Sequence, residues 1–103
     1  MPTILQVVDL RARWLYDFGH IPSAVWVAEA SDMGKQENEQ RLRDLLAEHI
    51  VQGGKNEIVV YCSTGHMAGL VAGVLGSRGF NVKNLQYGFG HCLDRHADRS
   101  QTD

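Results

Sequence analysis

Short apolar runs alternate with helical stripes along most of this chain, and that alternation limits the possible folds more than any other feature. Two stretches, Leu42 to Ile50 and Met67 to Leu75, have apolar residues at the 3.6-residue period of a helix, and glycines follow each of them. The other runs are rich in β-branched residues and short enough to be buried strands. These runs are Ile4–Leu10, Ala24–Val27, Ile58–Tyr61 and Val82–Leu85. The alternation predicts an open α/β domain, a parallel sheet of about four strands with helices on both faces.

Length and charge narrow the class of protein further. The chain has 103 residues, of which 44% are hydrophobic, enough for one core, so we predict a single domain over residues 1–103 with a frayed polar tail at 94–103. The net charge of −2 supplies no field for a phosphate backbone, which argues against nucleic acid as a partner. No apolar run approaches the ~18 residues of a membrane-spanning helix. The first residues lack the features of a secretory signal, so we expect a cytoplasmic protein with no membrane partner.

The clearest predicted strand ends at Tyr61 and is followed by a loop of small residues ahead of a predicted helix. Ligands of parallel α/β sheets bind outside the carboxyl ends of the strands, which directs attention to Cys62. Ser63, Thr64 and Gly65 are small enough for the backbone to curl, so that several N–H groups point inward beside the helix N-terminus. Such a nest favours an anion, and the nearest candidate is the thiolate of Cys62 or a sulfur species attached to it. A small buried hydrophobe is the alternative role of Cys62, and its position alone does not decide between the two.

Two segments of the sequence resemble the signature motifs of the rhodanese family of sulfurtransferases. The first runs Asp9-Leu10-Arg11 and then Gly19-His20-Ile21-Pro22-Ser23-Ala24, and it is similar to the family's D-x-R and G-H-I-P-G-A motifs, with Ser23 in place of the usual glycine. The second is Ile58 to His66 with its cysteine loop, followed further on by Leu85-Gln86-Tyr87-Gly88-Phe89, which resembles the family's L-x-G-G-F ending. The order and spacing of both blocks match, which is more specific than the loop alone.

The resemblance implies a chemistry. In that family the loop cysteine takes a sulfane sulfur from a donor, becomes a persulfide and passes the sulfur to a thiophilic acceptor. Carried over by position, Cys62 is the nucleophile and sulfur carrier, and no cofactor is implied. The donor would be a small anion such as thiosulfate, or a protein or low-molecular-weight persulfide, and the acceptor a thiol or cyanide. A covalent carrier predicts ping-pong kinetics. The terminal sulfur would be held by the backbone N–H groups of Ser63, Thr64, Gly65, His66 and Met67.

The loop departs from the family at positions that bear on charge. Rhodanese loops often carry arginine or another polar residue at the fifth position after the cysteine, and frequently a basic residue directly after the cysteine. This chain has Met67 and Ser63 at those places. His66 is left as the titratable helper, so a persulfide is as good a candidate donor as thiosulfate. Related phosphatases and arsenate reductases need arginine six places after the cysteine to bind an oxyanion, and Ala68 at that place argues against phosphate-ester hydrolysis.

The family usually begins with a strand and helix upstream of the D-x-R strand. This chain resembles the minimal members that lack that unit. A sheet edge left unpaired favours self-association, so a homodimer is an expected partner state.

Several other residues receive structural rather than chemical roles. Asp9 and Arg11 are expected to form a buried ion pair, and His20 a hydrogen bond that fixes the turn into the second strand. Cys92 is expected to be a buried thiol, because nothing in the sequence brings it within ~2 Å of Cys62. The histidines and cysteines lack the paired ligands in tight loops of structural zinc sites, so no metal is predicted. Core or groove-wall positions are expected for the aromatic residues Trp14, Tyr16, Phe18 and Trp26.

The sequence therefore predicts a single-domain, rhodanese-like sulfurtransferase that uses Cys62 as its persulfide carrier. One alternative is a non-catalytic module that uses the fold to bind proteins, which the loss of basic loop residues favours and the retention of Cys62 opposes. The other is a redox-sensing thiol protein acting through Cys62 and Cys92.

Overall fold

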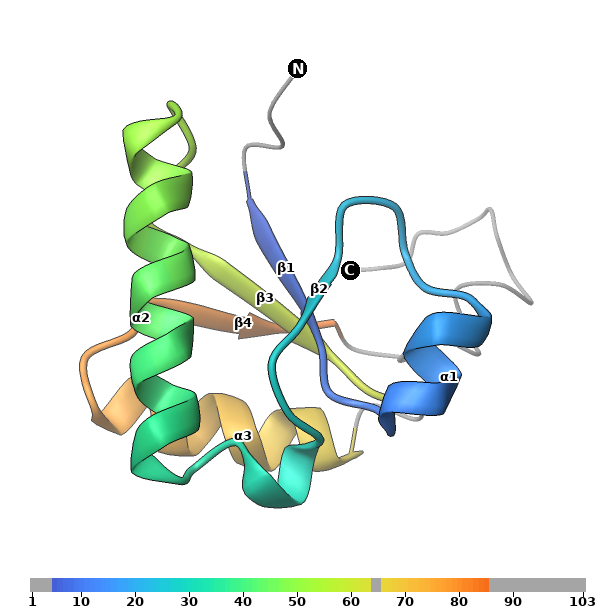
Figure 1. Cartoon of the computed structure of the whole chain (residues 1–103). Helices are drawn as coiled ribbons and strands as arrows, with labels where there is room; N and C mark the ends of the chain where they lie inside the picture. The colour runs from blue at the N-terminus through green and yellow to red at the C-terminus, as the bar shows by residue number, and fades with distance from the viewer. Residues whose placement is uncertain (1–4, 64–65, 86–103) are drawn as a thin grey trace.

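Over residues 5–63 and 66–85, which the computed structural model describes, the chain forms a four-stranded parallel sheet with helices packed on it (Figure 1). The strand order is β2-β1-β3-β4. The predicted tail at 94–103 and Cys92 lie outside the described residues. The strands are β1 (Gln6–Asp9), β2 (Val25–Trp26), β3 (Ile58–Tyr61) and β4 (Val82–Asn84). The helices are α1 (Arg13–Phe18), the 3₁₀ helix η1 (Ala30–Asp32), α2 (Gln36–Val51) and α3 (His66–Ser77).

The predicted fold class, an open parallel sheet of about four strands with helices, is confirmed. β3 has the predicted bounds, whereas the other strands are shorter than their apolar runs. The parallel register places Asp9 beside both Tyr61 of β3 and Trp26 of β2. The carboxyl ends of β1, β2 and β3 therefore meet at one edge of the sheet.

Glycines end both long helices by the same hydrogen-bonding motif. Gly53 has φ of +99° and donates to Ile50 O, while Gly54 donates to His49 O. At the end of α3, Gly79 has φ of +97° and donates to Gly76 O, while Phe80 donates to Leu75 O. These are Schellman motifs, in which the left-handed residue is glycine because a Cβ is disfavoured there. The predicted helix ends are confirmed.

One hydrophobic core lies between the sheet and the two long helices. Val8, Ile58 and Val60 of the strands are fully buried and belong to the same cluster as the inward residues of α2 and α3. Those helical residues are Leu42, Leu46, Ala68, Val71 and Leu75. Because side chains alternate along a strand, Asp9 and Tyr61 point to the opposite face, which is contacted by the segment after α1 through Ile21 N–H and the Tyr61 hydroxyl.

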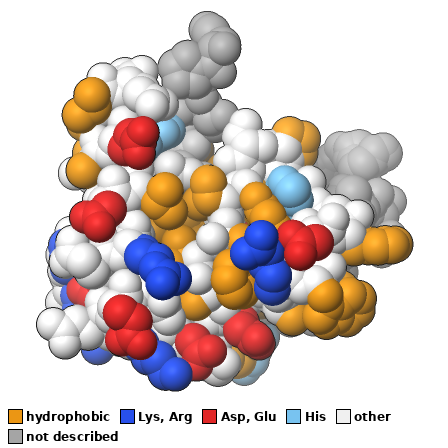
Figure 2. Space-filling model, viewed as in Figure 1, with side chains coloured by type: hydrophobic (Ala, Val, Ile, Leu, Met, Phe, Trp, Pro, Cys, Tyr) orange, Lys and Arg blue, Asp and Glu red, His pale blue; other side chains and the backbone are white. Residues whose placement is uncertain are grey.

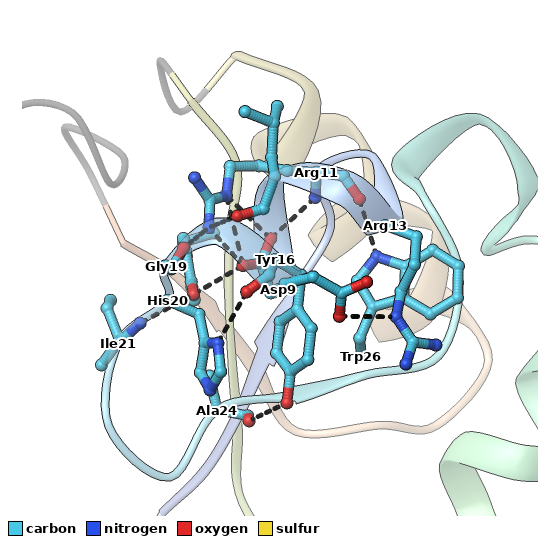
Figure 3. Close-up of polar contacts among 12 residues, drawn as sticks. Asp9, Arg11, Arg13, Tyr16, Gly19, His20, Ile21, Ala24 and Trp26 are labelled. Carbon is cyan, nitrogen blue, oxygen red and sulfur yellow. Dashed lines mark hydrogen bonds and ion pairs between the residues drawn. The ribbon is translucent and has the colours of Figure 1, made fainter.

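The expectation that four aromatic residues are core or groove wall is wrong for two of them. Trp14 and Phe18 of α1 are 68% and 89% exposed, because no residue of this short helix is buried and α1 lies on the side of the molecule opposite to α2 (Figure 1). Tyr16 and Trp26 are half-buried. They are held by their polar atoms: the Tyr16 hydroxyl donates to Ala24 O at 2.9 Å and Trp26 Nε1 donates to Arg11 O at 2.7 Å (Figure 3).

The face seen in Figure 2 carries Lys, Arg, Asp and Glu side chains of both signs around a central group of hydrophobic ones. A mixed surface of this kind produces no strong single-sign field. None of the helices in the described part of the chain has both the length and the apolar character needed to cross a membrane.

Candidate functional site

Cys62 lies where β3 passes into α3, with its sulfur beneath the first turn of the helix. Its side chain belongs to the core cluster, and the residue is 7% exposed. The backbone N–H of Ala68 donates to Cys62 Sγ at 3.3 Å. Ala68 is the third residue of α3, one of the first-turn positions whose N–H has no carbonyl partner inside the helix. The helix N-terminus therefore provides a donor, and a positive dipole end, directly at the sulfur.

An open cleft of about 330 Å³ reaches Cys62 from the surface. Its walls come from the segments that follow the carboxyl ends of β1, β2 and β3, as the rule for parallel sheets predicts. Leu15 of α1 and Met67 of α3 complete it. The remaining lining residues are Leu10, Arg11, Ala12, Glu29, Ala30, Ser31 and Ser63.

Of the residues predicted for the site, two line this cleft with Cys62 and His66 is not among its lining residues. Ser63 and Met67 are exposed and line the cleft beside Cys62. His66 is exposed at the first position of α3. Thr64 and Gly65 lie outside the described residues.

Two contributions to the site were missed in the sequence. The backbone N–H of Ala68 donates to the sulfur, and Ala68 lies one position beyond the predicted segment. This donor could have been predicted from the sequence, because the N–H of the third residue of a helix has no carbonyl partner inside the helix. The wall from Glu29 to Ser31 follows β2, and no local pattern places it near Cys62.

Arg11 and Glu29 are the charged residues among the described ones that line the cleft, and Arg11 is already engaged. Its guanidinium forms an ion pair with Asp9 at 2.8 Å, and its Nη2 also donates to Gly19 O at 2.5 Å. Burial lowers the pKa of Arg11, but the hydrogen bond and the negative charge of Asp9 outweigh this effect and raise the pKa overall. The predicted buried ion pair is confirmed. Arg11 therefore holds the cleft wall together and contributes little net charge to a ligand.

Tyr61 completes this buried polar group on the far side of the sheet from the core. Its hydroxyl donates to Asp9 Oδ2 at 2.8 Å and accepts from Ile21 N–H at 3.1 Å. Burial, together with the neighbouring Asp9 carboxylate, raises the pKa of Tyr61 far above its ordinary value. The hydroxyl therefore stays protonated and works as a structural donor just before Cys62.

His20 makes the hydrogen bond expected of it, to the end of α1. Its Nδ1 lies 2.8 Å from Tyr16 O, and its ring stacks on the Tyr16 ring with centroids 3.9 Å apart (Figure 3). The contact fixes the chain between α1 and β2. Within the described residues, no group of three or more His, Cys, Asp or Glu side chains is arranged to hold a metal ion.

With this geometry in view, comparison with known proteins shows the family. The chain matches the rhodanese-like domain model over residues 2–91 and belongs to that family. No curated protein matches the sequence.

Solved structures match the fold across almost the whole chain. The N-terminal domain of a Clostridium difficile 630 protein described as ATP/GTP binding is 25% identical, with a TM-score of 0.62 and 88% of each chain covered. The human single-domain sulfurtransferase TSTD1 is 19% identical, with a TM-score of 0.66, covering 91% of this chain and 85% of that one. Saccharomyces cerevisiae Ygr203w, a homologue of single-domain rhodanese and of the Cdc25 phosphatase catalytic domain, is 20% identical, with a TM-score of 0.66, covering 91% and 67%.

Proposed function

We propose that this protein is a sulfurtransferase in which Cys62 carries a sulfane sulfur as a persulfide. The observation that carries the proposal is the placement of Cys62 Sγ at the base of an open cleft with the Ala68 N–H directed at it. A donor in this position stabilises negative charge on the sulfur. Membership of the rhodanese-like family supports the same chemistry.

The reaction would consist of two displacements at sulfur. After losing its proton to solvent, the Cys62 thiolate attacks the sulfane sulfur of the donor, a new S–S bond forms, and the donor's bond to that sulfur breaks. The electron pair leaves with the donor, as sulfite from thiosulfate or as a thiolate from a persulfide. An acceptor thiolate then attacks the terminal sulfur, and Cys62 leaves as thiolate. Backbone N–H groups of the loop from Ser63 to Met67 would hold the terminal sulfur.

A persulfide donor fits this cleft better than thiosulfate. Thiosulfate is a dianion, and the cation in the described cleft wall, Arg11, is paired with Asp9. Glu29 adds a carboxylate to the same wall. Met67 and Ser63 are uncharged and stand where relatives often have basic residues, so they add no positive charge. We therefore expect a persulfide donor to have a lower KM than thiosulfate.

The same shortage of positive charge favours a second candidate function, a non-catalytic rhodanese-like module that binds proteins. Both candidates keep the fold and the cleft. They differ in whether Cys62 exchanges sulfur.

Steady-state kinetics separate the two functions. Donor and acceptor concentrations are varied together, with thiosulfate and a low-molecular-weight persulfide as donors and a thiol or cyanide as acceptor. A sulfurtransferase gives parallel double-reciprocal lines, since donor product leaves before the acceptor reacts. The Cys62→Ser variant should lose at least about 10³-fold in kcat.

Cys92→Ser is the matched control and should keep its turnover. Intersecting lines, or turnover that survives Cys62→Ser, contradict the proposed mechanism. An absence of turnover with every donor contradicts the sulfurtransferase and favours the binding module.

A further inference from the structure

Helix α3 carries more apolar surface than the fold buries. Ala68, Val71 and Leu75 point into the core. Met67, Leu70 and Val74 are 40%, 56% and 42% exposed. Residues spaced by three and four lie in one row along a helix, so these three side chains form a continuous apolar row.

This row borders a groove of about 210 Å³, which we call the α3 groove. Its other wall is formed by Ala30, Ser31 and Gly34. Ala30, Ser31 and Met67 also line the Cys62 cleft, so the groove and the cleft are continuous. From Met67 to Val74 the helix rises about 10 Å, comparable to the length of a hexyl or octyl chain.

We propose that the α3 groove binds the apolar part of a thiol or persulfide substrate whose sulfur reacts at Cys62. The substrate class is an alkyl or aryl thiol rather than a small dianion. This inference rests on the proposed function and adds to it the part of the substrate that lies beyond the reacting sulfur.

Charge and burial both support an apolar ligand. The lining residues of the groove are aliphatic apart from Ser31 and Gly34, and none of them is charged. The cleft beside it offers a paired arginine and a carboxylate. Binding free energy is therefore available from burial of hydrocarbon and not from attraction of an anion.

In the acceptor half-reaction the chain of the thiol lies along α3 while its thiolate attacks the terminal sulfur of the Cys62 persulfide. The bond between that sulfur and Sγ breaks, Cys62 leaves as thiolate, and the product is the persulfide of the apolar thiol. The donor half-reaction is the reverse. Neither step needs an external oxidant or reductant.

Labelling of Cys62 by alkyl methanethiosulfonates tests the groove without requiring sulfur transfer. The Cys62 thiolate attacks the divalent sulfur that carries the alkyl group, a disulfide forms, the bond to the sulfonyl group breaks, and methanesulfinate leaves. Rates for the methyl, butyl and hexyl reagents are measured at the Cys62 peptide by mass spectrometry and divided by the rates with a small free thiol. The inference predicts a rise of about two- to fourfold per methylene as the groove fills.

A matched pair of variants locates the effect. Leu70→Gln places an amide in the groove and should reduce the hexyl-to-methyl rate ratio at least threefold. Ile50→Gln makes the same kind of change at a side chain that is 41% exposed on α2 and borders neither cavity, and should leave the ratio unchanged.

A ratio that stays flat from methyl to hexyl overturns the inference, even if Cys62 is shown to carry sulfur. So does a ratio that falls equally in both variants. A rising ratio that only Leu70→Gln reduces supports the groove. It does so even if the protein accepts no sulfur from any donor. That failure to accept sulfur would contradict the proposed function but not the groove.

Discussion

Ser23 departs from the family motif at a position where the backbone conformation is strained for any residue with a side chain. Its φ of 75° lies in the left-handed region, where a side chain costs about 1–2 kcal/mol. The family motif has glycine at this place, and glycine adopts that conformation without the clash. The sequence marks Ser23 as a departure, but only the backbone angle explains why glycine is preferred there.

Ser23→Gly should therefore stabilise the protein. Relief of the left-handed strain exceeds the ~0.5–1 kcal/mol of additional chain entropy that glycine loses on folding, so we expect the free energy of unfolding to rise by about 0.5–1 kcal/mol. Denaturant unfolding measures it. Ser31→Gly, in the 3₁₀ helix η1, is the matched control and should lower stability. Equal losses in the two variants would show that Ser23 is not strained.

Helix α3 packs on the sheet with one part of its apolar face and borders the two cavities with another. Its sequence does not separate these two roles. The apolar stripe from Met67 to Leu75 predicts a helix packed on the sheet, and Val71 and Leu75 confirm it. The stripe is wider than the buried face, and Met67, Leu70 and Val74 remain exposed beside the two cavities. The periodicity of the sequence identifies an apolar face of α3. How much of that face is covered depends on where η1 and the loop next to η1 lie.

Met67→Arg tests whether charge at the first turn of α3 limits use of thiosulfate. A guanidinium at the cleft wall would attract the dianion, so kcat/KM should rise by up to roughly fivefold, the equivalent of the ~1 kcal/mol that a partly exposed ion pair contributes. The gain should come from KM, since ground state and transition state are bound alike. Leu70→Arg lies in the α3 groove but outside the Cys62 cleft and should have a smaller effect. An unchanged or lower kcat/KM for Met67→Arg would show that the missing arginine is not the limitation.

A cluster of charges joins α2 to the end of α3. Glu39 Oε1 accepts from Arg78 Nη1 at 2.6 Å, and Glu39 Oε2 accepts from Arg43 Nη2 at 2.8 Å. The hydrogen bonds from Arg78 and then Arg43 lower the pKa of Glu39 below its ordinary value. A carboxylate whose pKa is lower in the folded state stabilises the fold above its unfolded-state pKa, and this contribution is lost as pH falls through the folded value.

A double-mutant cycle of Glu39→Gln and Arg78→Gln, followed by unfolding at several pH values, measures that contribution. The two substitutions should be non-additive at pH 7, and the coupling should fade as the solution is acidified below the ordinary range of glutamate. Coupling that is constant across this range, or absent at pH 7, would contradict the ion-pair account.

At the scale of the whole molecule, the sequence predicts the layers of the fold better than it predicts the walls of the site. The buried runs and helix ends are local patterns, so β3 and the glycines after α2 and α3 were predicted correctly. The rule that a buried charge needs a partner also predicts the pairing of Asp9 with Arg11. Glu29 and Ala30 line the same cleft as Cys62 because β2 lies next to β1 in the sheet, which is a non-local property. The exposure of Trp14 and Phe18 likewise depends on where α1 lies relative to the sheet.

Whether Cys62 accepts and holds one sulfur atom can be determined from the mass of the intact protein. The protein is incubated with thiosulfate or a persulfide donor, freed of small molecules and weighed. If Cys62 is the sulfur carrier, the mass should rise by about 32 Da, one sulfur atom, and this gain should be absent in Cys62→Ala, present in Cys92→Ser and lost on addition of an acceptor thiol. A protein whose mass is unchanged by every donor, or whose added sulfur persists in Cys62→Ala, would contradict this role of Cys62.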